Sequence, residues 1–273
     1  MPNILDQHSR PSTPFIHAGG PIGVLLVHGF LGSPHELQPL AERLAQDGHS
    51  VRVILLPGHG QNPEHLKGIG WQRWADHVQS ELEVLKRSTQ KTVMVGFSMG
   101  GLLSLLKAAK GQCDALVTMA PALELRLQKQ MQLAGLIKYV MPWMYPFKDA
   151  DFETRETQTN IRQYIPDADF SDQILVARLR AEVRIPLAAI GQLIAVQNAL
   201  KPMLKDVRVP LLVVQGRQDQ TVVPKSGQAI FDQVSSSHKQ LAWFEHSGHM
   251  LMYEGEGDVI CQTVSDWIGK TMG

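Results

Sequence analysis

The sequence holds few of the residues that cross-link small or secreted proteins, with 2 cysteines among 273 residues. Cys113 and Cys261 are too few for a disulfide framework, and their spacing fits no zinc motif. We therefore expect two free thiols in a reducing compartment. A chain of this length buries about three quarters of its unfolded surface, so we expect it to fold without a disulfide or a metal.

The sequence also lacks an excess of charge of either sign, because 26 Lys and Arg residues balance 26 Asp and Glu residues. No overall positive field exists to attract nucleic acid or an anionic membrane. Uninterrupted apolar runs fall short of a transmembrane helix, and no basic segment followed by an apolar run opens the chain. The sequence therefore predicts a cytoplasmic protein with no nucleic-acid partner and no stable membrane insertion. It leaves the oligomeric state open.

What the chain does contain is a series of short aliphatic runs that alternate with helical patterns. Continuous apolar runs of this length suit strands that are buried on both faces, and their alternation with helices favours a parallel sheet. The predicted fold class is α/β. The expected strands are 23–28, 51–55, 92–96, 114–119, 211–215 and 240–244.

The helix after the first strand has the clearest start signal. Ser33 reads as its N-cap, Pro34 as its first residue and Glu36 as the partner of Ser33 in a capping box, and Gly48 ends the helix. Four further helices are expected at 71–86, from just after Ser98 to about 110, at 225–234 and at 257–270.

Between positions 121 and 207 the strand signal disappears, and the pattern becomes helical. Residues 122–141 carry Leu, Met and Ile at helical spacing, and five prolines divide the rest. Helices inserted late in a parallel sheet act as a lid over the edge where ligands bind. We therefore divide the chain into a core, 1–120 and 208–273, and a helical cap, 121–207. Trp143, Tyr145 and Phe147 either line an acyl channel there or seal the cap onto the core.

The segment Gly96–Gly101, GFSMGG, contains the pattern G-x-S-x-G between a predicted strand and a predicted helix. A turn this sharp needs small residues two positions before and after the serine. It pushes the Ser98 hydroxyl out at the sheet edge, beside the amides of a helix N-terminus. Ser98 is therefore the candidate nucleophile. The alternative is a glycine-rich turn with a capping serine.

A serine nucleophile needs a base that is itself oriented by an acid. Asp219 directly follows the strand 211–215, at the edge that Ser98 also occupies, although it could merely cap a turn. His249 follows the last predicted strand at the same edge, with His246 as the competing base. His238 reads as a solvated turn residue. His246 and His249 lack a third ligand with metal spacing, so no metal site is predicted.

The negative oxygen that forms during acyl transfer needs amide donors. Met99 offers one at the start of the helix after Ser98. Phe30 offers the other, in the loop after the first strand, where Gly29 permits the backbone to turn. The alternative there is a plain connecting loop.

In chain order these motifs resemble the α/β-hydrolase family, and more closely its bacterial carboxylesterase and monoacylglycerol lipase group. The resemblance spans residues 22 to about 270. The matching segments are VHGFLGSP at 27–34, PGHG at 57–60, GFSMGG at 96–101, GRQD at 216–219, VVP at 222–224 and SGH at 247–249. The resemblance implies a mostly parallel twisted sheet flanked by helices. It also implies a Ser98–His249–Asp219 triad and an oxyanion hole of the Phe30 and Met99 amides.

The expected activity is that of a serine carboxylesterase for short to medium acyl chains, monoacylglycerols included, with a small-molecule ester as substrate and no cofactor. The acyl site is expected to be apolar if a subset of the aliphatic cap residues faces Ser98, and these residues are Leu123, Leu127, Met131, Leu133, Leu136, Ile137, Leu187, Ile190, Leu193 and Ile194. The triad alone does not distinguish a carboxylesterase from a thioesterase or a carbon–carbon bond hydrolase. A non-catalytic binding protein on the same scaffold is the third alternative.

Overall fold

The structure is a computed structural model, and it describes residues 4–5, 12–126, 142–162, 165 and 167–273. Its main sheet has seven strands in the order β1-β3-β2-β4-β5-β8-β9. β1 pairs antiparallel with β3, and every other pairing in the sheet is parallel. The strands are β1 (Phe15–His17), β2 (Ile22–Val27), β3 (Ser50–Ile54), β4 (Lys91–Phe97), β5 (Ala115–Met119), β8 (Leu211–Gly216) and β9 (Lys239–Phe244).

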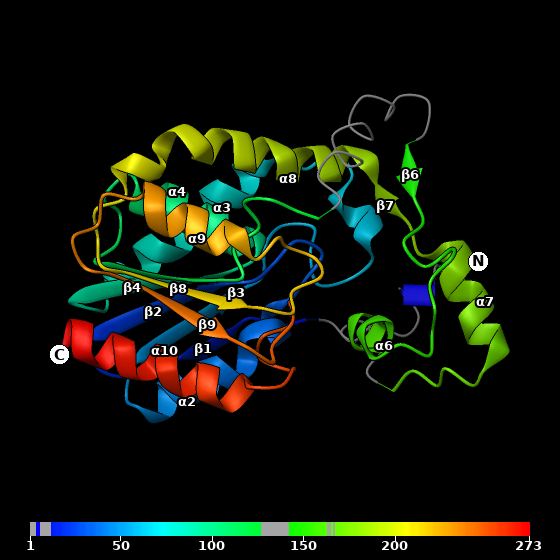
Figure 1. Cartoon of the computed structure of the whole chain (residues 1–273), viewed down its shortest axis with the longest axis horizontal. Coiled ribbons are helices and arrows are strands. Elements are labelled where there is room, and N and C mark those ends of the chain that lie inside the picture. Colours follow the sequence, from blue (N-terminus) through cyan, green and yellow to red (C-terminus); the bar gives the residue numbers. More distant parts are fainter. Residues whose placement is uncertain (1–3, 6–11, 127–141, 163–164, 166) are drawn as a thin grey trace.

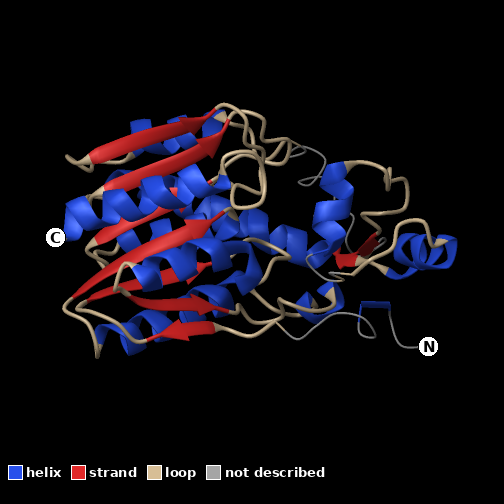
Figure 2. Cartoon of the chain, turned by 90° about the horizontal axis from the view of Figure 1, so that it is seen from below, coloured by secondary structure: helices blue, strands red, loops and turns tan. Residues whose placement is uncertain are grey.

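Helices cover both faces of this sheet (Figures 1 and 2). On one face, α2 (Gln38–Gln46) and α10 (Gly257–Met272) enclose a core cluster with the side chains of Val24 and Leu26. On the other, α3 (Trp71–Lys86), α4 (Met99–Ala108) and α9 (Lys225–Gln233) pack over Leu25 and Val27. The alternating side chains of β2 thus belong to two separate core clusters, one on each face of the sheet. The doubly covered sheet explains why its central strands read as continuous apolar runs.

All six predicted strands and the helices at 71–86, after Ser98, at 225–234 and at 257–270 are present, with ends shifted by a few residues. The antiparallel edge strand β1 was not predicted, since it is three residues long and mostly exposed. Gly48 and Gly111 have the left-handed φ angles of 88° and 66° that helix-ending glycines adopt.

The predicted capping box at Ser33 is wrong. The chain forms a 3₁₀ turn, η1 (Pro34–Leu37), before α2, and the Ser33 side chain makes no capping hydrogen bond. The carboxyl group of Glu36 turns inward and accepts a hydrogen bond from the Gly29 amide at 2.8 Å. A long-range contact therefore replaces the local one that the sequence pattern suggested.

Part of the segment between β5 and β8 extends beyond the sheet's carboxyl edge, whereas its longest described helix lies over α3 and α4 and shares their core cluster (Figure 1). The segment contains β6 (Trp143–Met144), α6 (Arg155–Arg162), α7 (Gln173–Glu182), β7 (Ile185–Pro186), α8 (Leu187–Leu200) and η3 (Lys201–Asp206). We expected this segment to be helical, but β6 and β7 pair antiparallel, so it is not wholly helical. Of the helix predicted at 122–141, residues 122–126 are not helical, and 127–141 lie outside the described residues. The domain boundaries at 121 and 207 stay predictions.

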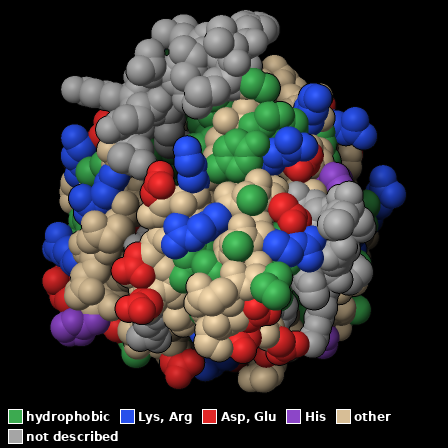
Figure 3. All heavy atoms as spheres, turned by 90° about the vertical axis from the view of Figure 1, so that its right-hand side faces the viewer, with side chains coloured by type: hydrophobic (Ala, Val, Ile, Leu, Met, Phe, Trp, Pro, Cys, Tyr) green, Lys and Arg blue, Asp and Glu red, His purple; other side chains and the backbone are tan. Residues whose placement is uncertain are grey.

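The cysteines, the hydropathy of the helices and the surface side chains bear on the expectations from composition. Cys113 and Cys261 are buried free thiols. Among the described residues, no helix combines the length and hydropathy needed to cross a membrane. On the face seen in Figure 3, acidic, basic and hydrophobic side chains are interspersed rather than sorted by sign.

Candidate active site

Ser98 occupies a strained turn between β4 and α4. Its φ and ψ angles are 52° and −116°, in a region that residues other than glycine rarely adopt. The turn is tight, because a Cβ atom on Gly96 would lie 2.3 Å from the Gly100 carbonyl oxygen and one on Gly100 would lie 2.0 Å from the Val27 carbonyl oxygen. The two glycines of the motif are therefore sterically required, and the turn directs Ser98 into a pocket.

Asp219 and His249 meet at the same edge of the sheet. Nδ1 of His249 donates to Oδ2 of Asp219 at 2.8 Å, while Oδ1 accepts from the amides of Thr221 and Val222, each at 2.8 Å. Asp219 is 0% exposed, and the His249 side chain is 15% exposed. The carboxylate thus caps its own turn and also shares a hydrogen bond with the imidazole, and its role as the acid of a triad stays a prediction.

The pKa of His249 is raised above its ordinary value. Burial lowers this pKa, but the hydrogen bond and negative charge of Asp219 outweigh burial, with further contributions from Glu36 and Glu254. The positive imidazolium is therefore favoured at this position. A base of this kind holds a proton well once it has accepted one.

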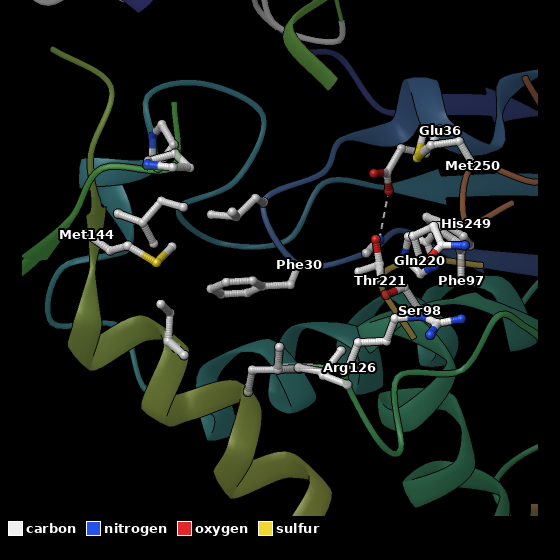
Figure 4. A pocket seen from close by; sticks show the side chains of 18 of the residues that line it. Phe30, Glu36, Phe97, Ser98, Arg126, Met144, Gln220, Thr221, His249 and Met250 are labelled. Atoms are coloured by element: carbon white, nitrogen blue, oxygen red, sulfur yellow. Dashed lines mark hydrogen bonds between the residues drawn. The ribbon is translucent and has the colours of Figure 1, made fainter. Parts of the chain in front are cut away.

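The other candidate histidines lie elsewhere. His246 is exposed, and His238 is an exposed residue before β9. His249 and Ser98 both line the pocket, and Figure 4 shows their side chains beside each other at one end of it. Within the described part of the chain, no recorded hydrogen bond joins Oγ of Ser98 to His249, a contact that often tightens only when substrate is bound.

Phe30 lies in the loop after β2 and lines the pocket, and Met99 is the buried first residue of α4. The first amides of a helix have no partner inside the helix, so the Met99 amide suits an oxyanion. The carbonyl group of the Gly29–Phe30 peptide is bound by His28, because Nδ1 of His28 lies 2.8 Å from the Gly29 carbonyl oxygen. Since a trans peptide points its C=O and N–H in opposite directions, this contact also fixes the direction of the Phe30 amide.

His28 is a residue whose contribution the sequence did not reveal. Nε2 of its ring accepts from the Leu56 amide at 3.0 Å, so Nδ1 carries the proton and donates to Gly29. Burial, together with the nearby His59, holds the pKa of His28 well below its usual value. His28 is thus a neutral ring that links the loops after β2 and β3. Its signal in the sequence was a histidine at the carboxyl end of the otherwise apolar strand expected at 23–28.

The pocket has a volume of about 440 Å³ and is lined mainly by apolar side chains. Figure 4 shows Phe30 between the end that holds Ser98 and His249 and the end that holds Met144. Of the aliphatic cap residues expected to face Ser98, Ile190 and Leu193 of α8 line the pocket, and the aromatic Phe147 lines it as well. The guanidinium of Arg184 instead lies over the ring of Trp143, with Cζ 4.3 Å from the ring centroid. Leu127, Met131, Leu133, Leu136 and Ile137 lie outside the described residues.

Arg126 fastens the start of the cap segment to the loop of the acid. Its Nε and Nη2 atoms donate to the Asp219 carbonyl oxygen at 2.9 and 2.8 Å, and its amide donates to the Thr221 carbonyl oxygen at 3.0 Å. Leu125 and Val222 form a β-bridge beside these contacts. No pattern in the sequence indicated this link. No cluster of three or more His, Cys, Asp or Glu side chains suited to a metal occurs in the described ranges.

Two curated proteins are similar to the chain over nearly their full length. A carboxylesterase of Bacillus subtilis (strain 168) is 26% identical over 94% of this chain and 96% of its own. A thermostable monoacylglycerol lipase of Bacillus sp. (strain H-257) is 27% identical over 95% of both chains.

Solved structures share the fold. A structure reported for the metagenome-derived lipolytic enzymes LipS and LipT superimposes with a TM-score of 0.80 at 24% identity, covering 97% of this chain and 100% of that one. A monoacylglycerol lipase of Paleococcus ferrophilus gives a TM-score of 0.72 at 18% identity, covering 95% and 98%. At these identities the likeness concerns the fold alone. Residues 22–256 match the family described as serine aminopeptidase, S33 (Hydrolase_4), and the chain therefore belongs to this hydrolase family, on an α/β-hydrolase fold.

Proposed function

We propose that the protein is a serine carboxylesterase that hydrolyses carboxylic esters with short to medium acyl chains, monoacylglycerols included. The observation that carries the proposal is the 2.8 Å contact between His249 and the buried Asp219, at the end of the pocket where Ser98 sits on its strained turn. The names of the two curated relatives, a carboxylesterase and a monoacylglycerol lipase, support the same class of substrate.

In the proposed mechanism, Oγ of Ser98 attacks the ester carbonyl carbon while His249 accepts the hydroxyl proton. The amides of Phe30 and Met99 hold the negative oxygen of the tetrahedral intermediate, and Asp219 stabilises the imidazolium. His249 then gives its proton to the leaving alcohol. Water, activated by the same imidazole, hydrolyses the acyl-enzyme and restores Ser98.

The lining of the pocket supports an ester with an apolar acyl group. Met144 offers hydrocarbon contacts at the end away from Ser98, Ile190 belongs to the same apolar cluster as Met144, and Leu193 also lines the pocket. Among the described lining residues, Glu36 supplies the one carboxyl group, and it is bound to the Gly29 amide. An aminopeptidase substrate would bring a positively charged amine, and no carboxyl group other than Glu36 is present among the described lining residues to pair with it. This favours esters over peptides despite the description of the family.

The test compares Ser98→Ala with Ser104→Ala in hydrolysis of short aryl esters and in labelling by a fluorophosphonate. Ser104 is a matched control, because it lies on α4, is fully buried and has a hydroxyl without a hydrogen-bond partner. We expect Ser98→Ala to lower kcat by at least about 10³-fold and to abolish labelling, because the nucleophile is lost. Ser104→Ala should keep both activities.

Unchanged turnover in folded Ser98→Ala would reject the proposed mechanism. A protein that neither labels nor turns over esters would instead be a binding protein on this scaffold. A parallel panel of esters, thioesters, vinylogous diketones and aminoacyl amides separates the esterase from the other hydrolases. The proposal requires the esters to give the highest kcat/KM.

A further inference from the structure

The loop between β2 and η1 packs its glycines against the carboxyl group of Glu36. This residue is 6% exposed, although glutamate is rarely buried without a partner. Oε2 accepts from the Gly29 amide at 2.8 Å, and the Gly32 amide closes the turn on the Gly29 carbonyl oxygen at 3.2 Å. The carboxyl group therefore holds one side of the Gly29 residue, while His28 holds the other.

The glycines of this loop leave the space that the carboxyl group fills. A Cβ atom on Gly32 would lie 2.2 Å from Oε2 of Glu36, which is a clash. A Cβ atom on Gly29 would lie 3.3 Å from Oε2 of Glu36 and also 3.3 Å from Cβ of Ser98. Gly29 thus lies between the carboxyl group of Glu36 and the proposed nucleophile, and it is close to both. Its lack of a side chain brings Glu36 close to the reacting centre.

The charged and titratable groups around Glu36 come from the loop after β9. His249 lies near enough for its charge to lower the pKa of Glu36, and Glu36 in turn raises the pKa of His249. Burial, and after it the charge of Glu36, raises the pKa of Tyr253, whose hydroxyl donates to the His35 carbonyl oxygen. Burial is the largest influence on Glu36 itself and raises its pKa to about 7. Glu36 therefore changes charge in the same pH range as a histidine.

We propose that Glu36 is a positioning residue of this site, which fixes the oxyanion loop through the Gly29 amide and provides a second acidic group beside His249. The inference rests on the proposed function. Whether neutral or ionised, the carboxyl group keeps an oxygen that accepts the Gly29 hydrogen bond. In its ionised form it also stabilises the imidazolium that forms when His249 takes the Ser98 proton. Asp219 sets the orientation of the ring, and Glu36 adds charge.

The experiment compares Glu36→Ala and Glu36→Gln with the control Glu42→Gln, which changes an exposed glutamate on α2. Glu36→Ala removes the Gly29 acceptor, so we expect kcat to fall on the order of 10–100-fold, as displaced catalytic groups generally cause, with a much smaller change in KM. Glu36→Gln keeps an acceptor oxygen but loses the charge. We expect it to retain most of kcat at the pH optimum. The acid limb of its kcat/KM profile should lie at lower pH than that of Glu42→Gln, since His249 loses a contribution that raises its pKa.

Thermal unfolding at pH 5 and pH 8 gives a readout that needs no catalysis. The folded protein binds the Glu36 proton with a pKa of about 7, against an ordinary value of 4.5, so this group's stabilisation falls as pH rises between the two values. Glutamine does not titrate. The wild type should therefore lose more of its Tm from pH 5 to pH 8 than Glu36→Gln does.

Equal kcat in Glu36→Ala and Glu42→Gln would overturn the inference. If Glu36→Ala does not fold, the pH profile of Glu36→Gln decides, and an acid limb that coincides with the control overturns it as well. A wild type that no fluorophosphonate labels would instead reject the proposed function. The unfolding comparison would then still report whether Glu36 titrates near neutral pH.

Discussion

At the scale of single residues, the two oxygens of Asp219 do different things. Oδ1 accepts from two backbone amides of its own turn, and Oδ2 accepts from His249. Because the amides fix Oδ1, an asparagine at this position would keep its oxygen there and turn its amino group toward the ring. Two hydrogen-bond donors would then face each other unless His249 changed its tautomer.

We therefore predict that Asp219→Asn lowers kcat on the order of 10³–10⁴-fold, through the wrong tautomer of the base. The acid limb of kcat/KM should also move to lower pH, because the hydrogen bond and charge of Asp219 are what raise the pKa of His249 against its burial. Steady-state kinetics between pH 5 and pH 9 measure both effects. Asp232→Asn, at an exposed position on α9, is the control. A fully active Asp219→Asn protein would remove Asp219 from the proposed triad.

At the scale of elements, the amino-terminal end of the chain belongs to the cap layer rather than to the sheet that it precedes. Ile4 and Leu5 are each 1% exposed, in an apolar cluster with Phe152, Ile161 and Leu179. The Ile4 amide donates to Oε2 of Glu182 on α7 at 2.7 Å. Figures 1 and 2 place this end beside the cap helices. Residues 4 and 5 thus pack against the cap and give it a further contact with a part of the chain that lies outside the cap segment.

We predict that Ile4→Ala with Leu5→Ala loosens the cap, since each buried aliphatic side chain reduced to alanine costs about 2–5 kcal/mol. Limited proteolysis should cut residues 147–183 faster than in the wild type, while the sheet core resists. Ile174→Ala is the matched control, because Ile174 lies on α7 and is 74% exposed. Cap cleavage at the wild-type rate in the double variant would contradict this role.

At the scale of the whole molecule, the pocket is built jointly by the sheet edge and the cap. Ser98 and Phe30 come from loops of the core, whereas Met144 and Phe147 come from the cap segment. In the proposed mechanism, the chemistry therefore belongs to the core loops and the choice of substrate to the cap segment. On this proposal, a change in the cap lining alters substrate preference without disturbance to the proposed triad.

We predict that Met144→Trp shifts the preference toward short acyl chains, because the larger ring fills the end of the pocket away from Ser98. The ratio of kcat/KM for an octanoyl ester to that for an acetyl ester should fall by at least about 10-fold, as methylenes excluded from an apolar pocket imply. Hydrolysis of a soluble ester series measures it. Val84→Trp, at an exposed position on α3, controls for a surface tryptophan. An unaltered chain-length profile would place the acyl group elsewhere.

The sequence by itself determined the sheet, most of the helices around it and the residues that gather at its carboxyl edge. These features depend on local patterns: apolar runs form buried strands, and residues that directly follow parallel strands share one edge. The tertiary structure decided the rest. Glu36 has the local pattern of a capping residue, yet its carboxyl group reaches the Gly29 amide, and Arg126 reaches the Asp219 carbonyl oxygen from 93 positions away. Such contacts arise from burial and hydrogen bonding between segments that only the completed fold brings together. No periodicity in the sequence therefore predicts them.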